Sequence, residues 1–284
     1  MGKLREQMEA DLALRGFSEL TQRYYVKNVS DFAKHFNRSP AQMGEQEVRA
    51  FLLHLIRDRK VSPGAQGNYL SALKFLYRHT LRHPEVVEHI PHPKTPKTLP
   101  VVLSKEEVLA IYEAIDSLKY KAIIATLYSA GLRISELLNL RPTDIDSNRM
   151  LIRIRGGKGK KDRYVMLSEH LLVLLRQYYR TVDHNSVYLF PGHDPQRPIS
   201  RTAVYNVLKK AAKSLRLSKK VSMHTLRHCF ATHLLEAGGD IRLVQVLLGH
   251  ASIRSTVRYT QISSEHLSRT KSPWDLLHSP PSDK

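Results

Sequence analysis

Residues 222–261 read SMHTLRHCFATHLLEAGGDIRLVQVLLGHASIRSTVRYTQ. Ser222 is suited to cap a helix, and the glycine pair at 238–239 is suited to end it. Asp240 can cap a second helix that closes at Gly249, and Ser252 can cap a third. The apolar faces of the first two helices consist of Leu226, Phe230, Ala231 and Leu234, and of Ile241, Val244, Leu247 and Leu248. The stretch therefore predicts three short helical segments packed on a core.

Four reactive side chains belong to this stretch: His224, Arg227, His250 and Tyr259. His224 and Arg227 are three residues apart and therefore neighbours on a helix surface. Taken singly, a histidine on a helix is most often a hydrogen-bonded structural residue, and a tyrosine is most often half-buried with its hydroxyl satisfied. A packed core alone does not need proton-transfer, phosphate-binding and nucleophilic groups in one short stretch, so their combination indicates an active site.

The order of these motifs resembles that of a known family. HTLRH at 224–228, LLGH at 247–250 and the following Tyr259 are similar to the C-terminal signature of the tyrosine recombinases, or lambda-integrase family. GLRISELLNL at 131–140 is similar to the first arginine box of that family, and GGKGKKDR at 156–163 to its lysine-bearing hairpin. The resemblance runs from Leu4 to about Leu277. It implies site-specific cleavage and rejoining of DNA strands through a covalent 3′-phosphotyrosyl intermediate, in integration, excision or resolution of mobile DNA.

The resemblance implies six catalytic residues and one supporting residue: Arg133, Lys158, His224, Arg227, His250 and Tyr259, with Glu136 in support. Attack on an anionic phosphodiester needs charge neutralisation, and guanidinium groups suit the non-bridging oxygens. Arg133 and Arg227 are the candidates for this role. The simpler interpretation of Arg133 is a surface ion pair with Glu136, three residues further on, which would contribute little to stability.

Tyr259 would be the nucleophile. A free tyrosine has a pKa of about 10, so it needs a base or a strongly positive pocket to attack at neutral pH. His224 would accept its proton, and His250 would hydrogen-bond the phosphate oxygens or the nucleophile. Lys158 would protonate the departing 5′ oxygen as a general acid.

Charge and cysteine content limit the class of protein. The chain has 284 residues, with 45 Lys and Arg against 26 Asp and Glu, and a net charge of +19. Such an excess can merely solubilise a protein, but clustered on one face it marks a nucleic-acid binder, so double-stranded DNA is the expected partner. Cys229 is the only cysteine, which fits a reducing cytoplasm. No run approaches the roughly 20 apolar residues of a membrane span, so we expect a cytoplasmic chain without membrane contact.

The length suits two domains. Helical periodicity runs through the first 80 residues, whereas five prolines fall between 83 and 100 and predict an extended, semi-rigid linker. We expect a helical domain at 1–82, which the resemblance identifies as a SAM-like core-binding domain, a linker at 83–100, a catalytic domain at 101–277 and a flexible tail at 278–284. The predicted fold class is mainly α with a small β-sheet (α+β), and its mixed catalytic domain is of the DNA breaking-rejoining type.

Two basic segments of the catalytic domain are candidates for DNA contact. Residues 151–155 and 164–167 predict a β-hairpin; its glycine-rich turn is either a solvated tip or, as the resemblance implies, delivers Lys158 into the minor groove. Residues 200–220 contain seven basic and no acidic residues, together with an apolar face, so the basic side can lie against DNA. The predicted DNA-binding residues are Arg153, Arg155, Lys160, Lys161, Arg201, Lys209, Lys210 and Lys213.

No metal or other cofactor is expected. His228 and His233 do not form H-E-x-x-H, and a single cysteine gives no structural zinc pattern. We interpret Cys229 as a small buried hydrophobe. A covalent phosphotyrosyl bond conserves the energy of the phosphodiester, so ATP is not required either.

Two other functions remain open. The same chemistry would serve a type IB topoisomerase, and a chain without catalysis could simply bind DNA. The resemblance implies a homotetramer on paired sites, with the C-terminal tail docking in trans on a neighbouring subunit. LPVVLSKEEV at 99–108 and KSPWDLL at 271–277 are similar to the integron-integrase branch, although the insertion that this branch carries before its HxLRH box is missing.

Overall fold

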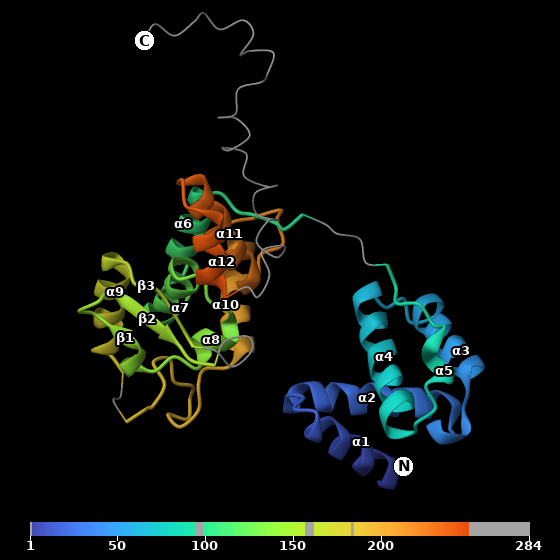
Figure 1. The fold of residues 1–284 in the computed structure, drawn as a ribbon. Coiled ribbons are helices and arrows are strands. Elements are labelled where there is room, and N and C mark those ends of the chain that lie inside the picture. The colour runs from blue at the N-terminus through green and yellow to red at the C-terminus, as the bar shows by residue number, and fades with distance from the viewer. Residues whose placement is uncertain (1, 95–98, 157–161, 183–184, 250–284) are drawn as a thin grey trace, which may run out of the picture. The chain divides into compact units, whose positions relative to one another are not determined.

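The computed structural model describes residues 2–94, 99–156, 162–182 and 185–249. It divides into two compact units, Met1–Lys97 and Thr98–Lys284 (Figure 1). Helices dominate both units, and the strands of the described residues all lie in the second. These elements confirm the predicted α+β class. None of the helices described is long and apolar enough to span a bilayer.

The first unit is a helical bundle. Its core contains Leu12, Phe32, Phe51 and Leu70, each at most 1% exposed. Ser62 caps one helix through its hydroxyl, which accepts from the Ala65 amide at 3.3 Å. The elements are α1 (Gly2–Leu14), α2 (Glu19–Phe36), the 3₁₀ turn η1 (Pro40–Gln42), α3 (Glu45–Arg57), α4 (Pro63–Phe75), the π-helical turn η2 (Leu76–Thr80) and α5 (Glu85–Glu88).

Helix α5 differs from the extended conformation expected for residues 83–100. Pro84 precedes it as the N-cap residue, a place where the missing amide of proline costs nothing. Val87 and Ile90 are buried in the core of the first unit. The prediction was wrong here because these apolar side chains complete the bundle, so this part of the segment has surface to bury.

The second unit consists of helices around a small antiparallel sheet with strand order β1-β2-β3. Ile152 pairs with Val165, and both are buried, so one face of the sheet packs on the core. The two-residue strand β1 was not predicted. The elements are α6 (Lys105–Glu113), α7 (Leu118–Ser129), α8 (Ile134–Leu138), η3 (Pro142–Asp144), β1 (Ile145–Asp146), β2 (Leu151–Ile154), β3 (Arg163–Met166), α9 (Glu169–Tyr179), α10 (Arg201–Ser214), α11 (Met223–Glu236) and α12 (Ile241–Leu248).

Helices α7 and α11 form the centre of this unit. Ile123 and Leu127 of α7 are fully buried. Cys229 of α11 is also fully buried, and burial raises the pKa of its thiol to about 11. The chain entering the unit is fixed to α11, because the Leu103 amide donates to Cys229 Sγ at 3.2 Å and the Leu103 carbonyl lies 2.9 Å from His233 Nε2.

Candidate active site

A tight turn between α7 and α8 positions Arg133. Gly131 in this turn has φ +60°, and a β-carbon there would lie 2.3 Å from the ring of Phe230 in α11. Glycine tolerates both the left-handed backbone and this close approach, because it has no β-carbon. The turn therefore packs directly on α11, and Arg133 becomes the N-cap residue of α8.

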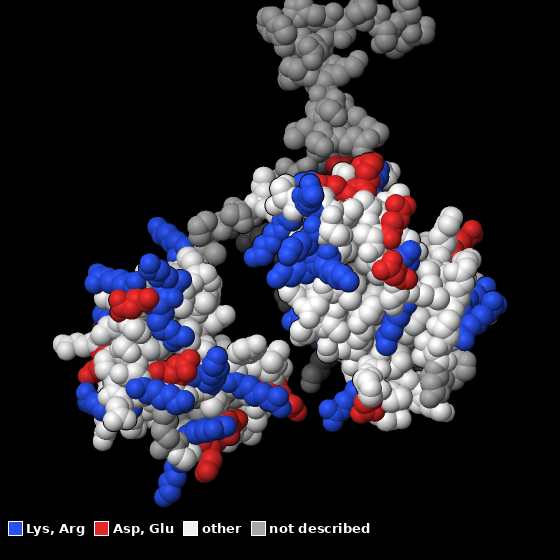
Figure 2. Space-filling model, turned by 180° about the vertical axis from the view of Figure 1, so that it is seen from behind, with Lys and Arg blue, Asp and Glu red and all other residues white. Residues whose placement is uncertain are grey.

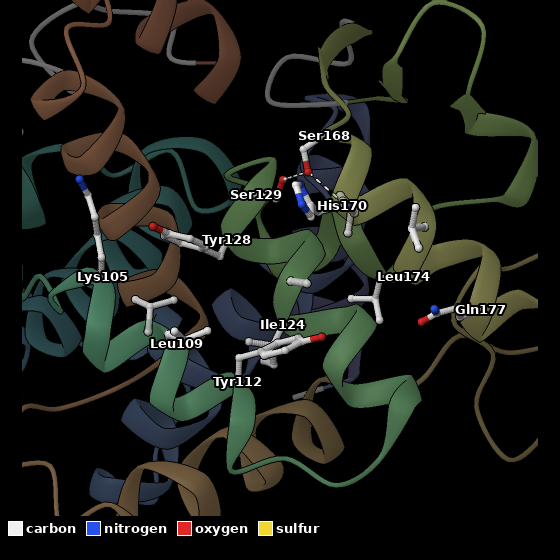
Figure 3. Close-up of a pocket in the computed structure, with 14 residues that line it drawn as sticks. Lys105, Leu109, Tyr112, Ile124, Tyr128, Ser129, Ser168, His170, Leu174 and Gln177 are labelled. Carbon is white, nitrogen blue, oxygen red and sulfur yellow. Dashed lines mark hydrogen bonds between the residues drawn. The ribbon is translucent and has the colours of Figure 1, made fainter.

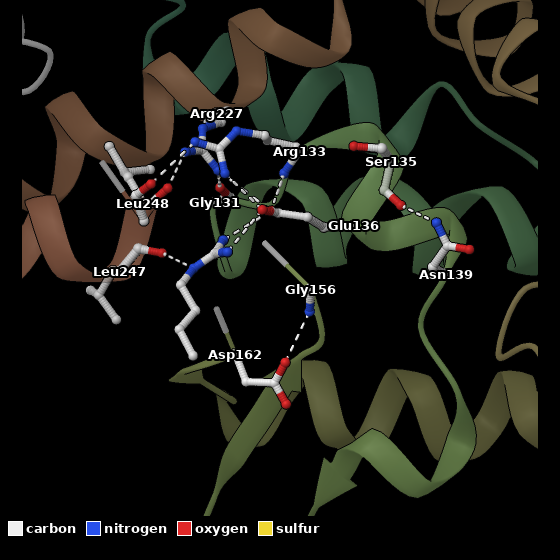
Figure 4. A network of polar contacts seen from close by, with 12 residues as sticks. Gly131, Arg133, Ser135, Glu136, Asn139, Gly156, Asp162, Arg227, Leu247 and Leu248 are labelled. Atoms are coloured by element: carbon white, nitrogen blue, oxygen red, sulfur yellow. Dashed lines mark hydrogen bonds and ion pairs between the residues drawn. The ribbon is translucent and has the colours of Figure 1, made fainter. Parts of the chain in front are cut away.

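Glu136 in the first turn of α8 is the centre of a polar cluster (Figure 4). Its Oε1 accepts from Arg133 Nη1 at 2.7 Å, and its Oε2 accepts from the Arg133 amide at 2.8 Å. Arg163, the first residue of β3, donates from Nη1 to Oε1 and from Nη2 to Oε2, both at 2.8 Å. Arg227 of α11 lies 3.7 Å from Oε2. Three guanidinium groups thus surround one carboxylate, whose side chain is only 7% exposed.

The same three arginines hold the end of α12. The carbonyls of residues 247–249 each accept a hydrogen bond from a different arginine of the cluster. The last carbonyls of a helix have no partner within it and carry the negative end of its dipole. The arginines therefore satisfy these groups and fix the backbone directly before residue 250. The pairs are Arg163 Nε with Leu247 at 2.9 Å, Arg227 Nη2 with Leu248, and Arg133 Nη2 with Gly249 at 3.4 Å.

The charge state of the cluster follows from its geometry. Burial raises the pKa of the Glu136 carboxyl, but hydrogen bonds and positive charge from Arg163 and Arg133 outweigh burial and lower that pKa to about 2. Glu136 is therefore ionised at neutral pH. Three cations surround one anion, which leaves a local excess of positive charge that suits an anionic phosphodiester.

The three arginines differ in access to solvent. The side chain of Arg133 is 25% exposed, that of Arg163 10% and that of Arg227 1%. Arg227 is also anchored to the turn before α8, since its Nη1 donates to the Gly131 carbonyl at 2.6 Å. The ion pair of Arg133 with Glu136 is present as the simpler interpretation predicted, but it is not a surface pair, because the carboxylate is buried.

His224 lies in the first turn of α11, and its side chain is exposed. Its ring contacts the ring of His228, one helical turn further on, with centroids 4.4 Å apart. Arg227 points into the protein, although only three residues separate it from His224. Helix α11 thus carries a group capable of proton transfer on its exposed side and a guanidinium group of the charged cluster on its buried side.

The remaining predicted catalytic residues, Lys158, His250 and Tyr259, lie outside the described residues, as do Lys160 and Lys161. Their neighbours are described. Strands β2 and β3 pair as far as Ile154 and Arg163, and the Gly156 amide donates to Asp162 Oδ1 at 2.9 Å. The strand ends on either side of residues 157–161 thus adjoin the arginine cluster.

Of the predicted DNA-binding residues of the hairpin, the two that the structure describes are paired within the unit. Arg153 Nη2 lies 2.7 Å from an oxygen of Asp162. Arg155 Nε lies 2.6 Å from an oxygen of the buried Asp144. On α10 the four predicted basic residues are all exposed: Arg201, Lys209, Lys210 and Lys213. Lys and Arg side chains gather on parts of the visible faces of both units, with Asp and Glu interspersed (Figure 2).

A groove between α6, α7 and α9 is apolar (Figure 3). It has a volume of about 630 Å³, and Leu109, Ile124 and Leu174 are among the side chains that line it. Ser129 and Ser168 share a hydrogen bond of 3.4 Å at its edge. None of the three arginines around Glu136 lines this groove, so it offers a surface for apolar contact and not for phosphate.

Arg163 was not among the predicted site residues. The alternation of the strand carried a signal, because residues 163 and 165 lie on the same face of β3 and Val165 is an inward-facing apolar residue. An arginine on the inner face of a strand needs a buried anionic partner. Glu136 is that partner.

Comparisons with known proteins agree with the geometry. Residues 101–266 match the phage integrase family, and residues 4–85 match the N-terminal SAM-like domain of phage integrases. The chain is 44% identical over 281 residues to y4qK of Sinorhizobium fredii, covering 99% of this chain and 91% of that protein. It is 38% identical over 264 residues to the tyrosine recombinase XerA of Pyrococcus horikoshii, covering 92% of this chain and 90% of that protein.

A solved structure supports the fold. The crystal structure of the site-specific recombinase XerH bound to its palindromic difH substrate aligns with a TM-score of 0.73 at 24% identity, over 92% of this chain and 82% of that one. The family match covers most of the second unit, and XerA is a tyrosine recombinase that is 38% identical to this chain. This chain therefore belongs to the phage integrase family and is a tyrosine-type site-specific recombinase.

Proposed function

We propose that this recombinase cleaves DNA with Tyr259 as the nucleophile and with Arg133 and Arg227 as the groups that bind the scissile phosphate. The observation that supports this most is the buried cluster around Glu136. It gathers three cations at the end of α12, directly before the segment that contains His250 and Tyr259. Charge of this kind stabilises a phosphate that gains negative charge in its transition state.

The proposed step exchanges one phosphate ester for another. The Tyr259 oxygen attacks phosphorus, the bond from phosphorus to the 5′ oxygen breaks, and a 3′-phosphotyrosyl link forms. His224 takes the phenolic proton, and Lys158 gives a proton to the departing 5′ oxygen. His250 hydrogen-bonds the phosphate or the nucleophile. A 5′ hydroxyl from a second strand then reverses these steps, so the rejoining needs no energy source.

We further propose that the protein acts in the cytoplasm on mobile DNA, as a homotetramer on paired sites, with its C-terminal tail docked on a neighbouring subunit. The apolar groove between α6, α7 and α9 supports this docking, because Leu109 and Val173 at the groove are more than half exposed. The tail sequence SPWDLL at 272–277 offers matching apolar side chains. Sedimentation of the protein on DNA that carries two sites would count the subunits, and fewer than four in the complex would contradict the proposal.

The test of the chemistry is covalent trapping. Wild type and Tyr259→Phe are incubated with nicked duplexes in which cleavage releases a short fragment that carries the leaving 5′ hydroxyl. Loss of this fragment prevents rejoining. Wild type should form a DNA adduct that survives denaturation, and peptide mapping should place the DNA on Tyr259. The phenylalanine variant should bind the same duplex and form no adduct.

Two results would contradict the proposal. An adduct that persists in Tyr259→Phe would exclude this nucleophile. Relaxation of supercoiled plasmid without any exchange between paired sites would place the activity with the type IB topoisomerases.

A further inference from the structure

Arg163 occupies an unusual place for a hairpin arginine. It opens β3 directly after the segment that contains Lys158, and its backbone pairs with Ile154 of β2. Its side chain nevertheless points into the protein and is only 10% exposed. Arg153, on the neighbouring strand, is 48% exposed by contrast. Two arginines on paired strands of one hairpin thus differ in exposure, and Arg163 is the one that contacts the interior.

The guanidinium group of Arg163 makes contacts in two directions. Both of its Nη atoms donate to Glu136, one to each carboxylate oxygen, at 2.8 Å. Its Nε donates to the Leu247 carbonyl at 2.9 Å. A bidentate pair is the most orienting contact that an arginine can make with a carboxylate. Arg163 therefore fixes the orientation of Glu136 and ties it to the last turn of α12.

These contacts limit how closely Glu136 can pair with Arg133 and Arg227. Because Arg163 donates to both carboxylate oxygens, the side chain of Arg133 makes a single hydrogen bond to Glu136, through Nη1 at 2.7 Å. Arg227 stays at 3.7 Å from the nearer oxygen. Without Arg163 the buried carboxylate oxygens would lose two hydrogen-bond donors. The carboxylate would then draw Arg133 or Arg227 into a closer ion pair.

We propose that Arg163 is a positioning residue for DNA cleavage. It acts through Glu136, whose negative charge it neutralises so that Arg133 and Arg227 keep their positive charge directed at the scissile phosphate. It also holds the end of α12, where the chain continues to His250. This inference rests on the function proposed above, because it needs the two other arginines to bind phosphate.

The first experiment separates binding from chemistry. Single-turnover cleavage of the nicked duplex is measured at saturating protein for wild type, Arg163→Met and Arg163→Lys. Removing one charge-stabilising donor costs a rate factor of roughly 100 to 1000, and a residue that acts through another should cost less, about 10 to 100. Arg163→Lys keeps the charge but cannot make the bidentate contact, so its cleavage rate should lie between those of wild type and Arg163→Met. The Kd for DNA should change by less than about threefold.

The matched control is Arg197→Met. Arg197 belongs to the same unit and pairs with Asp194 at 3.6 Å, but its side chain is 84% exposed. An exposed pair of this kind contributes little, so this variant should cleave at the wild-type rate. Thermal unfolding of each variant shows whether the fold is intact. If Arg163→Met does not fold, Arg163→Lys provides the same comparison.

The second experiment tests how Arg163 acts. A methylphosphonate at the scissile position replaces one charged non-bridging oxygen by a methyl group, so less positive charge is needed around it. If Arg163 maintains that charge, the ratio of wild-type to variant rates should fall at least about tenfold on this substrate. An equal ratio on both substrates would overturn the inference, as would wild-type cleavage by Arg163→Met. Failure of wild type to form any adduct would instead count against the proposed function itself.

Discussion

Glu136 allows three arginines to share one small volume. Guanidinium groups that surround a single point repel one another, and their repulsion grows as water is excluded. A buried carboxylate offsets this repulsion, and its hydrogen bonds set where each group points. At the scale of single residues, the site therefore depends as much on its one anion as on its cations.

The first prediction concerns acid stability. Hydrogen bonds and charge from the arginines lower the pKa of Glu136 from its ordinary 4.5 to about 2. A lowered pKa gives stability that is fully present above the unfolded value and is lost as pH falls toward the folded value. The shift corresponds to about 3 kcal/mol at neutral pH. The free energy of unfolding of wild type should therefore exceed that of Glu136→Gln at pH 7, and the difference should shrink steadily between about pH 5 and pH 2.

Chemical denaturation across this pH range measures the effect, and Glu9→Gln is its control. Glu9 accepts from Arg5 at 2.8 Å in an exposed pair, which should contribute at most about 1 kcal/mol. A difference between wild type and Glu136→Gln that stays constant with pH would show that the carboxylate is not held ionised by the cluster.

The sequence predicts only part of this cluster. The spacing of Arg133 and Glu136 on one helix predicted their ion pair, and the motif around Arg227 predicted a phosphate-binding role. Arg163 lies 27 residues from its partner Glu136, so nothing local connects the two. The pairing exists because β3 packs against α12 and its first residue reaches Glu136 of α8. Such a contact between distant segments follows from tertiary packing and not from a local pattern.

At the scale of elements, the turn between α7 and α8 decides whether the cluster can form. The Gly131 carbonyl accepts from Arg227, and Arg133 follows two residues later. The turn must therefore lie against α11. Because Phe230 occupies the space beside Gly131, the fit leaves no room for a side chain.

The second prediction is that Gly131→Ala strongly destabilises the second unit. Its left-handed φ of +60° costs an alanine about 1 kcal/mol or more, and a β-carbon 2.3 Å from Phe230 forces the turn away from α11. We expect a loss of roughly 3 kcal/mol or more in the free energy of unfolding. The cleavage rate of the protein that remains folded should also fall, because Arg133 moves with the turn.

Gly156→Ala is the control for this prediction. Gly156 has nearly the same φ, +57°, but a β-carbon there meets nothing within 4 Å. Its replacement should cost only the backbone strain, about 1 kcal/mol. Equal losses in the two variants, measured by urea unfolding, would show that the contact with Phe230 adds nothing.

Elements with local signals were predictable, and those that depend on distant partners were not. Ser222, Asp240 and Gly249 cap α11 and α12 as their sequence predicted, since capping acts within one helical turn. Helix α5 was missed because its few residues are stabilised by burial of Val87 and Ile90 in the bundle. Strand β1 has two residues and exists through its pairing with β2.

At the scale of the whole molecule, the charge of +19 favours association with DNA of any sequence. Such charge acts through the side chains that face the duplex and can release its counterions. Helix α10 is the described element best suited to this role. Lys209, Lys210 and Lys213 lie on its exposed side, while Leu208 and Ala211 are buried in the core.

The third prediction concerns the salt dependence of DNA binding. Each lysine that neutralises a phosphate adds about 0.9 to the slope of log K against log salt concentration. If all three lysines of α10 contact phosphates, replacing them together by alanine should reduce the slope by up to about 3.

Lys219→Ala is the control, because its ammonium group already pairs with Glu107 at 2.6 Å and should release few counterions from DNA. Titration of a labelled duplex at several salt concentrations gives the slopes. An unchanged slope in the triple variant would show that these lysines do not contact phosphates. A change in Lys219→Ala of about one third of the change in the triple variant would show that the loss reflects net charge alone.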